Sequence, residues 1–242
     1  MNNIIQIVGG NSDIAFSTSK IFAKNGYDIH LVSKNFKNLK IKKDKLENNF
    51  NIQCKITELD IENENDVKLF FEKEKDHVSI VLMAVGYHEK EEKNYDKIVN
   101  LNHKSLIFYI EKAIERYSNY ENFKTIIGIS SVAADRKDNK NNVYSSSKAD
   151  FTNYLNKLRL RLYEKQIDVM IIKPGYVKTK MTASLNLPSF LVSTPDRIGE
   201  IIFNSFKNNK ENVYAPGYWR YIMLLYKNIP QFIFKLFLIF KR

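Results

Sequence analysis

Short apolar runs, separated by longer segments with helical spacing, recur through residues 4–175 of this 242-residue chain. The runs lie at residues 4–8, 27–32, 51–59, 78–85, 125–129 and 169–172. The run at 78–85 is almost entirely apolar, which predicts a central strand buried on both faces. Helices are expected between the runs, the longest at 98–117 and 144–164. Strands that alternate with helices form a parallel sheet, so we expect one α/β domain with a doubly wound parallel sheet.

Composition and charge exclude several other classes of protein. The chain is 44% hydrophobic and 27% charged, which is ordinary for a folded protein. Its net charge of +11 is spread along the whole sequence, apart from a concentration at the C-terminal end. Nucleic-acid binding would rest on this charge alone, so we expect no nucleic-acid partner.

Cysteine and histidine usage indicates the compartment and argues against a metal. Cys54 is the one cysteine, so no internal disulfide can form, and a lone cysteine fits a reducing compartment. Residues 1–8 show no charged region followed by a long apolar run, so no signal peptide is expected and a cytoplasmic location is predicted. The histidines are His30, His77, His88 and His103. Their spacing matches no metal site, so no metal is expected.

The first strand runs directly into Gly9-Gly10-Asn11-Ser12-Asp13-Ile14-Ala15, and a helix is expected at 13–25. A strand, a glycine turn and a helix are the context of a dinucleotide fingerprint. Glycines let the backbone approach the pyrophosphate, and the helix N-terminus faces it. The alternative is an ordinary strand-to-helix turn in which Ser12 or Asp13 caps the helix.

The end of the second strand bears on the choice of cofactor. In folds of this kind an acid at this place binds the ribose of NAD, whereas a cation accepts the 2′-phosphate of NADP. Ser33 and Lys34 stand there, with no acid, so NADP(H) is predicted over NAD(H). Lys37 and Lys40 either assist or are solvated loop charges.

Tyr144 and Lys148 are four residues apart, so they lie on one face of a helix, one turn from each other. A tyrosine has an ordinary pKa of about 10, which a nearby ammonium and a cationic nicotinamide would lower. The pair could therefore donate a proton to a carbonyl oxygen that receives a hydride. Ser131 would give a second hydrogen bond to that oxygen. The alternative is that Tyr-x-x-x-Lys marks a solvated helix face.

Together these residues resemble the short-chain dehydrogenase/reductase family over nearly the whole chain. The matching features are the turn at Gly9, Asp60-Ile61, the strand ending at Gly86, Asn102, Ser131, Tyr144, Lys148 and Pro174-Gly175-x-Val177-x-Thr179. The resemblance implies a Rossmann-type fold, Tyr144 as general acid and Ser131 as the donor that polarises the carbonyl. It implies that Lys148 binds the nicotinamide ribose and lowers the pKa of the tyrosine, and that Asn102 anchors a water-mediated proton relay.

The resemblance also implies the cofactor site. Asp60 is expected near the adenine and Thr179 near the nicotinamide carboxamide. The expected cofactor contacts are Gly9, Asn11, Ser12, Asp13, Ile14, Ser33, Lys34, Asp60, Ile61, Ala84, Val85, Gly86, Tyr144, Lys148, Pro174, Gly175, Val177 and Thr179.

Two departures from the family pattern matter. Asp13 and Ala15 replace glycines, and Met83-Ala84-Val85-Gly86 replaces Asn-Asn-Ala-Gly. A carboxylate near a pyrophosphate is repelled unless it points away. At these positions the sequence resembles one branch of the family, the reductases that act on the 2-keto sugar of decaprenylphosphoryl-pentofuranosulose in cell-envelope synthesis. That branch shares a strand end like Ala84-Val85-Gly86-Tyr87 and a segment like Tyr214-Ala-Pro-Gly-Tyr-Trp219-Arg220.

The chain is divided into a dinucleotide-binding domain at 1–217 and a hydrophobic, basic tail at 218–242. The tail is rich in aromatic and aliphatic residues but is interrupted by Lys227, Pro230 and Lys235. A spanning helix needs about 20 predominantly apolar residues, so none is expected. Pro230 should divide the tail into two short helices. These helices either lie at a membrane surface, on its inner face, or pack on the domain or in a dimer contact.

Three hypotheses of function follow. The first is an NADPH-dependent reductase of a keto-sugar, either free or linked to a polyprenyl phosphate, in cell-envelope polysaccharide synthesis. The second keeps the chemistry but reduces a fatty or other hydrophobic ketone, and a substrate lid at 185–192 would suit either. The third is a non-catalytic dinucleotide-binding partner subunit, which has no need of the full set Ser131, Tyr144, Lys148 and Asn102. The resemblance also suggests a homo-oligomer.

Overall fold

The computed structural model describes residues 3–89, 91–136, 142–183 and 188–230. Seven parallel strands form one sheet in the order β3-β2-β1-β4-β5-β6-β9. They are β1 (Ile4–Val8), β2 (Asp28–Ser33), β3 (Cys54–Glu58), β4 (Val78–Met83), β5 (Thr125–Ile129), β6 (Asp168–Pro174) and β9 (Asn212–Ala215). The chain adds strands in one direction from β1 and in the other from β4, so the expected doubly wound sheet is confirmed. Ligands bind where the strand order reverses in this way, beyond the carboxyl ends of the strands.

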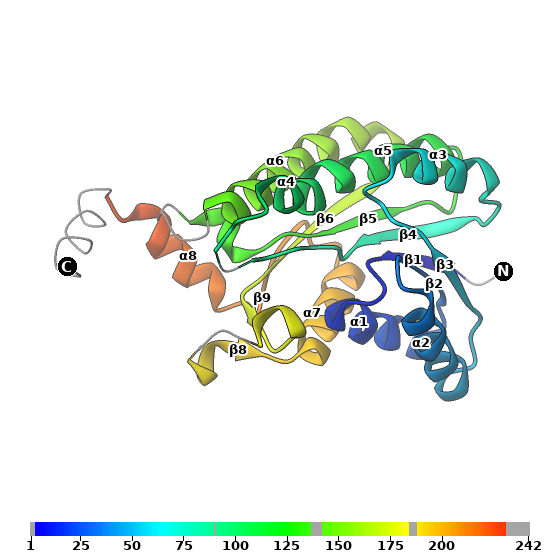
Figure 1. The fold of residues 1–242 in the computed structure, drawn as a ribbon, viewed down its shortest axis with the longest axis horizontal. Coiled ribbons are helices and arrows are strands. Elements are labelled where there is room, and N and C mark those ends of the chain that lie inside the picture. Colours follow the sequence, from blue (N-terminus) through cyan, green and yellow to red (C-terminus); the bar gives the residue numbers. More distant parts are fainter. Residues whose placement is uncertain (1–2, 90, 137–141, 184–187, 231–242) are drawn as a thin grey trace.

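Helices cover both faces of the sheet (Figure 1). One layer holds α1 (Asp13–Lys24), α2 (Phe36–Asn49) and α7 (Pro195–Lys207). The other holds α3 (Glu64–Lys73), α4 (Tyr95–Val99), α5 (Ser105–Tyr117) and α6 (Asn142–Leu162). Because both faces are covered, every residue of β4 and of β5 is buried, as the apolar run at 78–85 predicted.

Each face of the sheet has its own hydrophobic core. On the side of α3, α5 and α6, Val81, Tyr109 and Phe151 belong to one continuous buried cluster. On the side of α1, α2 and α7, Leu82 and Phe22 belong to the other. Val81 and Leu82 are neighbours in β4, so the two cores receive alternate residues of the same strand.

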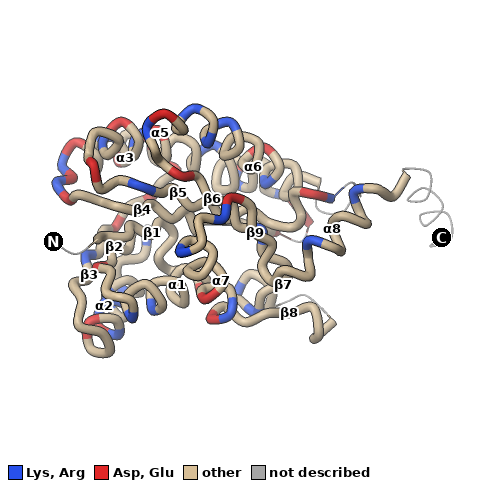
Figure 2. The backbone as a smooth tube through the Cα atoms, turned by 180° about the vertical axis from the view of Figure 1, so that it is seen from behind, with Lys and Arg blue, Asp and Glu red and all other residues tan. Residues whose placement is uncertain are grey.

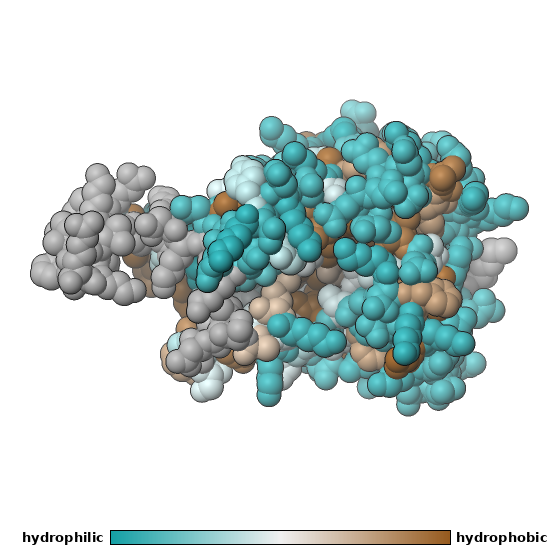
Figure 3. All heavy atoms as spheres, in the orientation of Figure 1, coloured by the Kyte–Doolittle hydropathy of each residue, from teal (hydrophilic) through white to brown (hydrophobic). Residues whose placement is uncertain are grey.

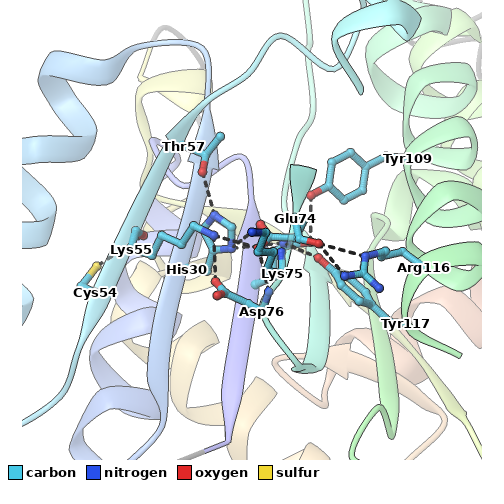
Figure 4. Close-up of polar contacts among 11 residues, drawn as sticks. His30, Cys54, Lys55, Thr57, Glu74, Lys75, Asp76, Tyr109, Arg116 and Tyr117 are labelled. Atoms are coloured by element: carbon cyan, nitrogen blue, oxygen red, sulfur yellow. Dashed lines mark hydrogen bonds and ion pairs between the residues drawn. The ribbon is translucent and has the colours of Figure 1, made fainter. Parts of the chain in front are cut away.

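A buried polar group interrupts the first of these cores. Gln6, in the middle of β1, accepts a hydrogen bond from the Tyr109 hydroxyl (2.8 Å) and donates from Nε2 to the Tyr117 hydroxyl (3.1 Å). The same Nε2 lies 3.2 Å from Nδ1 of His30, whose Nε2 lies 2.8 Å from Oγ1 of Thr57. Burial lowers the pKa of His30 to about 4, so the ring is neutral at ordinary pH. Figure 4 shows the residues around His30.

An ion-pair network continues from His30 to the end of α3 (Figure 4). The ammonium of Lys55 lies 2.8 Å from Glu74 and 2.9 Å from Asp76. Potential metal-ligating atoms of His30, Glu74 and Asp76 lie within 4.8 Å of one another in the described part of the chain. Because the Lys55 ammonium already bridges the two carboxylates, we interpret the group as structural. The prediction that the chain holds no metal stays a prediction.

The helix expected at 98–117 is interrupted. It consists of α4, a π-helical turn at Asn100–Lys104 and α5. The helical spacing of apolar residues over 98–117 predicted one continuous helix and did not reveal this turn. The turn contains Asn102, and π-turns of this kind are frequent at functional sites.

The tail begins with α8 (Trp219–Asn228), which packs against the 3₁₀ turn Val132–Asp135. Asp135 is buried and lies 2.8 Å from the Lys173 ammonium and 2.7 Å from the Lys227 ammonium, while the Tyr214 hydroxyl donates to it at 2.7 Å. The first helix of the tail thus packs on the domain with one face, while Tyr221 and Leu225 remain exposed, so the choice between the two alternatives for the tail stays open. The helix ends before Pro230, and the expected second helix lies outside the described residues.

Acidic and basic residues are interspersed over the helices of both layers (Figure 2), as the sequence indicated for the net charge. Hydrophilic side chains cover most of the face drawn in Figure 3. Among the residues that the structure describes, no helix is long and apolar enough to cross a membrane.

Candidate active site

The predicted site residues come from separate parts of the sequence and meet at the carboxyl ends of β1, β4, β5 and β6. Gly9 has φ of +86°, and a Cβ atom there would lie 2.8 Å from the backbone of Ala84 at the end of β4. The turn after β1 therefore depends on glycine twice, for its left-handed backbone and for its close approach to β4. The amides of Gly9 and Gly10 both donate to the carbonyl of Val32 in β2.

The N-terminus of α1 faces the site, and Ser12 is its cap. The Ser12 hydroxyl accepts a hydrogen bond from the amide of Ala15 at 3.0 Å, so of the two candidate caps the structure uses Ser12. Asp13 follows in the first turn, and its carboxylate accepts a hydrogen bond from the amide of Lys180 at 3.1 Å. The carboxylate thus contacts the segment after Thr179, and Asp13 lines the first cavity.

Two adjoining cavities occupy the switch point of the sheet. One, of about 300 Å³, is lined by the ends of β5 and β6, by α6 and by the turn into α1. The other, of about 280 Å³, is lined by the ends of β1 and β2 and by Asp60 and Ile61. Asn11, Ser12, Ala84, Val85 and Gly86 line both.

Every residue expected to contact the cofactor lines one of these cavities. The first holds Asp13, Ile14, Tyr144, Lys148, Pro174, Gly175, Val177 and Thr179, the second holds Gly9, Ser33, Lys34, Asp60 and Ile61, and the remaining five line both.

Lys34 lies at the end of β2 as expected, but it has acidic neighbours. Its ammonium is 3.7 Å from Asp60 and 3.6 Å from Glu62, and its side chain is 56% exposed. These are loose pairs on the surface, so they hold the lysine weakly. A phosphate at this place would compete with two carboxylates for the same cation.

Ser131 and Tyr144 both line the first cavity. Ser131 follows β5 and its hydroxyl accepts a hydrogen bond from the amide of Ala133 at 3.1 Å. Burial raises the pKa of Tyr144, while a hydrogen bond with Ser131 and the charge of Arg136 lower it. Burial has the larger effect, so in the protein alone the pKa of the phenol lies above its ordinary value, whereas the sequence analysis expected the ammonium of Lys148 to lower it.

Lys148 is buried one turn further along α6. Its ammonium donates to the carbonyl of Ile129 at 3.2 Å. Burial lowers the pKa of Lys148 to about 7, because this neutral acceptor does not replace the solvation of a full charge. The ammonium also lies 5.9 Å from the centroid of the Phe151 ring, so both of these partners are neutral. A buried amine with neutral partners is suited to hydroxyl groups of a bound ligand.

Asn102 lies beside the cavities but does not line them. Its amide nitrogen donates to the carbonyls of Tyr87 (2.6 Å) and Ile98 (2.9 Å), and its oxygen accepts from the amide of Tyr87 (3.1 Å). The side chain therefore holds the segment after β4 in place. Any water that Asn102 anchors would have to bind its main chain.

Two residues beside Tyr144 were not expected from the sequence. The ring of His88 lies edge-on to the ring of Tyr144, with centroids 5.1 Å apart. Arg136 donates from Nη2 to the hydroxyl of Tyr176 at 2.9 Å and acts on the pKa of Tyr144 through its charge. Neither residue belongs to a motif, so only the tertiary structure could place them at the site.

Comparisons with known proteins agree with this geometry. The family model "short chain dehydrogenase" matches residues 3–189. A mouse protein named 3-oxoacyl-[acyl-carrier-protein] reductase is 23% identical over 211 residues, which cover 84% of this chain and 87% of the mouse protein. A short-chain dehydrogenase from Sphingobium yanoikuyae, solved in complex with NADPH, superposes with a TM-score of 0.78 at 18% identity over 95% of this chain and 97% of the other. A 3-oxoacyl-[acyl-carrier protein] reductase from Brucella melitensis, solved with NAD, superposes with a TM-score of 0.78 at 18% identity over 90% of this chain and 96% of the other.

This chain belongs to the short-chain dehydrogenase family. It is an NAD(P)-dependent oxidoreductase that acts on alcohol or ketone groups. Three features of the structure fit such a cofactor. The turn at Gly9 leaves room only for glycine, the N-terminus of α1 faces two joined cavities, and the partners described for the buried Lys148 amine are neutral.

Proposed function

We propose that this protein reduces a ketone with NADPH and that the ketone belongs to a keto-sugar carried by a lipid. The observation that supports the reaction is that Ser131, Tyr144 and Lys148 line the same cavity as the residues expected to hold the nicotinamide. When bound, the nicotinamide supplies the hydride. The protein must supply a proton and must stabilise the negative charge that develops on the carbonyl oxygen.

Each of the three side chains has one task in this proposal. Tyr144 holds the proton on its phenol oxygen and donates it to the carbonyl oxygen. Ser131, which lines the same cavity and lowers the pKa of Tyr144, donates a second hydrogen bond to that oxygen. Lys148 binds the ribose hydroxyls and, in its protonated form, lowers the pKa of the phenol. A water bound to the main chain of Asn102 would return a proton to the tyrosine.

The preference for NADP(H) rests on the end of β2. Ser33 occupies the position where an acid would bind the ribose of NAD, and the Nδ2 atom of Asn11 donates to its hydroxyl at 3.2 Å. Lys34, which is exposed and only loosely paired, is the cation available to a 2′-phosphate. Among similar structures one holds NADPH and another holds NAD, so the preference depends on these residues.

Two observations support a lipid-linked keto-sugar as the substrate. One is the resemblance to the branch of reductases in Ala84-Val85-Gly86-Tyr87 and in the segment from Tyr214 to Arg220, and the other is the exposed surface near this segment. The Tyr218 hydroxyl donates to the carbonyl of Leu191, so the residue that precedes α8 contacts the turn Ser189–Leu191. Phe190, Tyr221 and Leu225 are 79%, 70% and 72% exposed on these two elements. Large exposed apolar side chains near a basic tail are typical of contact with a membrane surface.

On this proposal the dinucleotide-binding domain at 1–217 performs the reaction, and the tail at 218–242 brings it to the inner face of the membrane. A homo-oligomer is compatible with the proposal. The second candidate is a reductase of a 3-oxoacyl thioester or another hydrophobic ketone, favoured by the names of the mouse and Brucella proteins. The non-catalytic partner subunit remains the alternative from another class.

Oxidation of NADPH and of NADH with a panel of ketones distinguishes these candidates. The panel comprises nucleotide keto-sugars, polyprenyl-phosphate-linked uloses in detergent and acetoacetyl-coenzyme A, with Tyr144→Phe as the control. Turnover confined to the lipid-linked sugars, and lost in the variant, is the expected result. Turnover of acetoacetyl-coenzyme A alone would support the second candidate, and no turnover at all would support the third.

Membrane contact is tested separately by sedimentation with anionic liposomes. We expect the full chain to bind and a Tyr221→Ser/Leu225→Ser variant to lose most of the binding, because each buried apolar side chain contributes about 1.5–3 kcal/mol. Leu160→Ser, on the exposed side of α6, is the matched control, since Leu160 is 79% exposed but lies outside α8. If the full chain stays in the supernatant, the membrane part of the proposal is wrong.

A further inference from the structure

Glu92 is an acidic side chain that turns inward from an otherwise exposed segment. Its neighbours Glu91 and Lys93 are exposed and form an ion pair with each other at 2.6 Å. Glu92 is partly buried and has φ of +47°, a left-handed backbone that is uncommon for any residue other than glycine. Such a conformation persists only where surrounding contacts hold it.

Those contacts are with the first turn of α6. One carboxylate oxygen of Glu92 accepts a hydrogen bond from the amide of Tyr144 at 2.9 Å, and the other accepts from the amide of Val143 at 3.2 Å. The first amides of a helix have no acceptor within the helix. A carboxylate at this end also interacts favourably with the helix dipole. Glu92 thus supplies from a distant part of the chain what a capping residue normally supplies locally.

The same segment is fixed at its beginning. Asn102 holds both the amide and the carbonyl of Tyr87, as described above. Between this anchor and Glu92 lies His88, whose ring contacts the ring of Tyr144 edge-on. The main chain of Tyr144 is therefore held by Glu92 and its ring contacts His88, while Ser131 lines the same cavity and lowers the pKa of the phenol.

We propose that Glu92 is a positioning residue for the reaction: by binding the amides of Val143 and Tyr144 it fixes the start of α6, and with it the phenol of Tyr144 opposite Ser131. Glu92 contacts the main chain of Tyr144 and none of the reacting atoms. The inference rests on the proposed function, in which Tyr144 donates the proton. A proton donor must be held close to its target, since a displacement of about 1 Å can cost about a hundredfold in rate.

Hydrogen exchange of the full chain, followed by mass spectrometry, tests the contact without any need for a substrate. In Glu92→Ala, we expect the amides of Val143 and Tyr144 to exchange roughly tenfold faster, because they lose a charged acceptor. Glu91→Ala is the matched control, since it removes the adjacent carboxylate. In this variant the amides of Val143 and Tyr144 should exchange at the wild-type rate. Unchanged exchange in Glu92→Ala would overturn the proposal.

Kinetics with NADPH and the ketone turned over in the panel test the consequence. Glu92→Ala should lower kcat by about tenfold or more while the KM for NADPH stays within about twofold, because the cofactor contacts lie elsewhere. Glu92→Gln should recover part of kcat, since its amide oxygen still accepts one of the two hydrogen bonds. An equal loss in Glu91→Ala, or no loss in Glu92→Ala, would contradict the proposal.

The two measurements separate this inference from the proposed function. A wild type that exchanges slowly at these amides but reduces no ketone in the panel would overturn the reductase proposal, and with it the catalytic part of this inference. The role of Glu92 in holding α6 would then be decided by the exchange measurement alone.

Discussion

At the scale of single residues, Asp13 sets a limit on cofactor binding. Its carboxylate lines the first cavity and accepts the amide of Lys180, so a negative charge lies close to where a pyrophosphate would bind. We expect Asp13→Asn to bind NADPH about fivefold more tightly, because the amide oxygen can still accept that hydrogen bond while the charge is removed. Titration of NADPH fluorescence gives the dissociation constant.

The exposed Asp150 of α6 provides the control for Asp13. Asp150→Asn removes the same charge from a residue that lines neither cavity, so NADPH affinity should not change. Weaker binding in Asp13→Asn would show that the charge itself contributes to cofactor binding, for example through a ribose hydroxyl.

The buried ammonium of Lys148 is expected to lower the free energy of unfolding, although the proposed reaction requires this residue. Its pKa is lowered by burial from 10.5 to about 7, so between these values the unfolded chain binds more protons than the folded one. Stability contributed by this group therefore rises with pH from about 7 to about 10.5, and below about 7 its full cost is present. Without bound nucleotide, Lys148→Met should raise the free energy of unfolding at pH 7 by roughly 2–4 kcal/mol, although activity is lost.

Urea unfolding at pH 7 and at pH 9.5 checks the sign of this effect. The advantage of Lys148→Met over the wild type should shrink at the higher pH, because the wild-type lysine then costs less. A variant that is less stable than the wild type at pH 7 would mean that the ammonium has a compensating partner in solution.

At the scale of elements, the docking of α8 depends on one buried carboxylate. Burial would raise the pKa of Asp135, but hydrogen bonds from Lys173, Lys227 and Tyr214 outweigh it, so the pKa is lowered. The stabilisation is present above the ordinary pKa of the carboxyl and is lost as the pH falls through the lowered value. Trp219, the one tryptophan of the chain, is buried where α8 meets Gly175, so its fluorescence reports on docking.

Asp135→Asn should release α8 from the domain. We expect a red shift of the Trp219 emission at pH 7 and a loss of about 3 kcal/mol of stability, because the ammonium groups of Lys173 and Lys227 both lose their ion pair with this carboxylate. Asp196→Asn is the control, since Asp196 pairs with Lys20 at the surface and such pairs contribute at most about 1 kcal/mol. An unshifted emission spectrum in Asp135→Asn would show that apolar contacts of α8 suffice for docking.

At the scale of the whole molecule, cofactor binding and folding are linked. A ligand that binds only the folded chain stabilises it by about 2.7 kcal/mol at one hundred times its dissociation constant. At equal concentration we expect NADPH to raise the melting temperature more than NADH does. Lys34→Ala should remove most of that difference, because Lys34 is the cation available to the 2′-phosphate.

The exposed Lys37 of α2 is the matched control for Lys34. Lys37→Ala should leave the difference between NADPH and NADH intact if the lysine is a solvated charge. Equal stabilisation of the wild type by both nucleotides would contradict the predicted preference and would indicate that Asp60 and Glu62 neutralise Lys34.

The sequence by itself predicted the doubly wound fold and the expected cofactor contacts, all of which line one or both of the two cavities. This was possible because strands alternate with helices, and because the turn at Gly9, Tyr-x-x-x-Lys and Pro174-Gly175 are local patterns whose chemistry depends on short spacing. The carboxyl ends of parallel strands then bring these patterns together at one edge of the sheet.

Only the tertiary structure decided which side chains and main-chain groups surround these sequence patterns. The contacts of Asp13 with Lys180, of Asn102 with Tyr87 and of Glu92 with Tyr144 join segments that no periodicity connects. The same holds for the pKa of Tyr144, which depends on burial and on the nearby Ser131 and Arg136. Local spacing fixes the chemistry that side chains can perform, whereas their solvation and their partners arise when distant segments pack together.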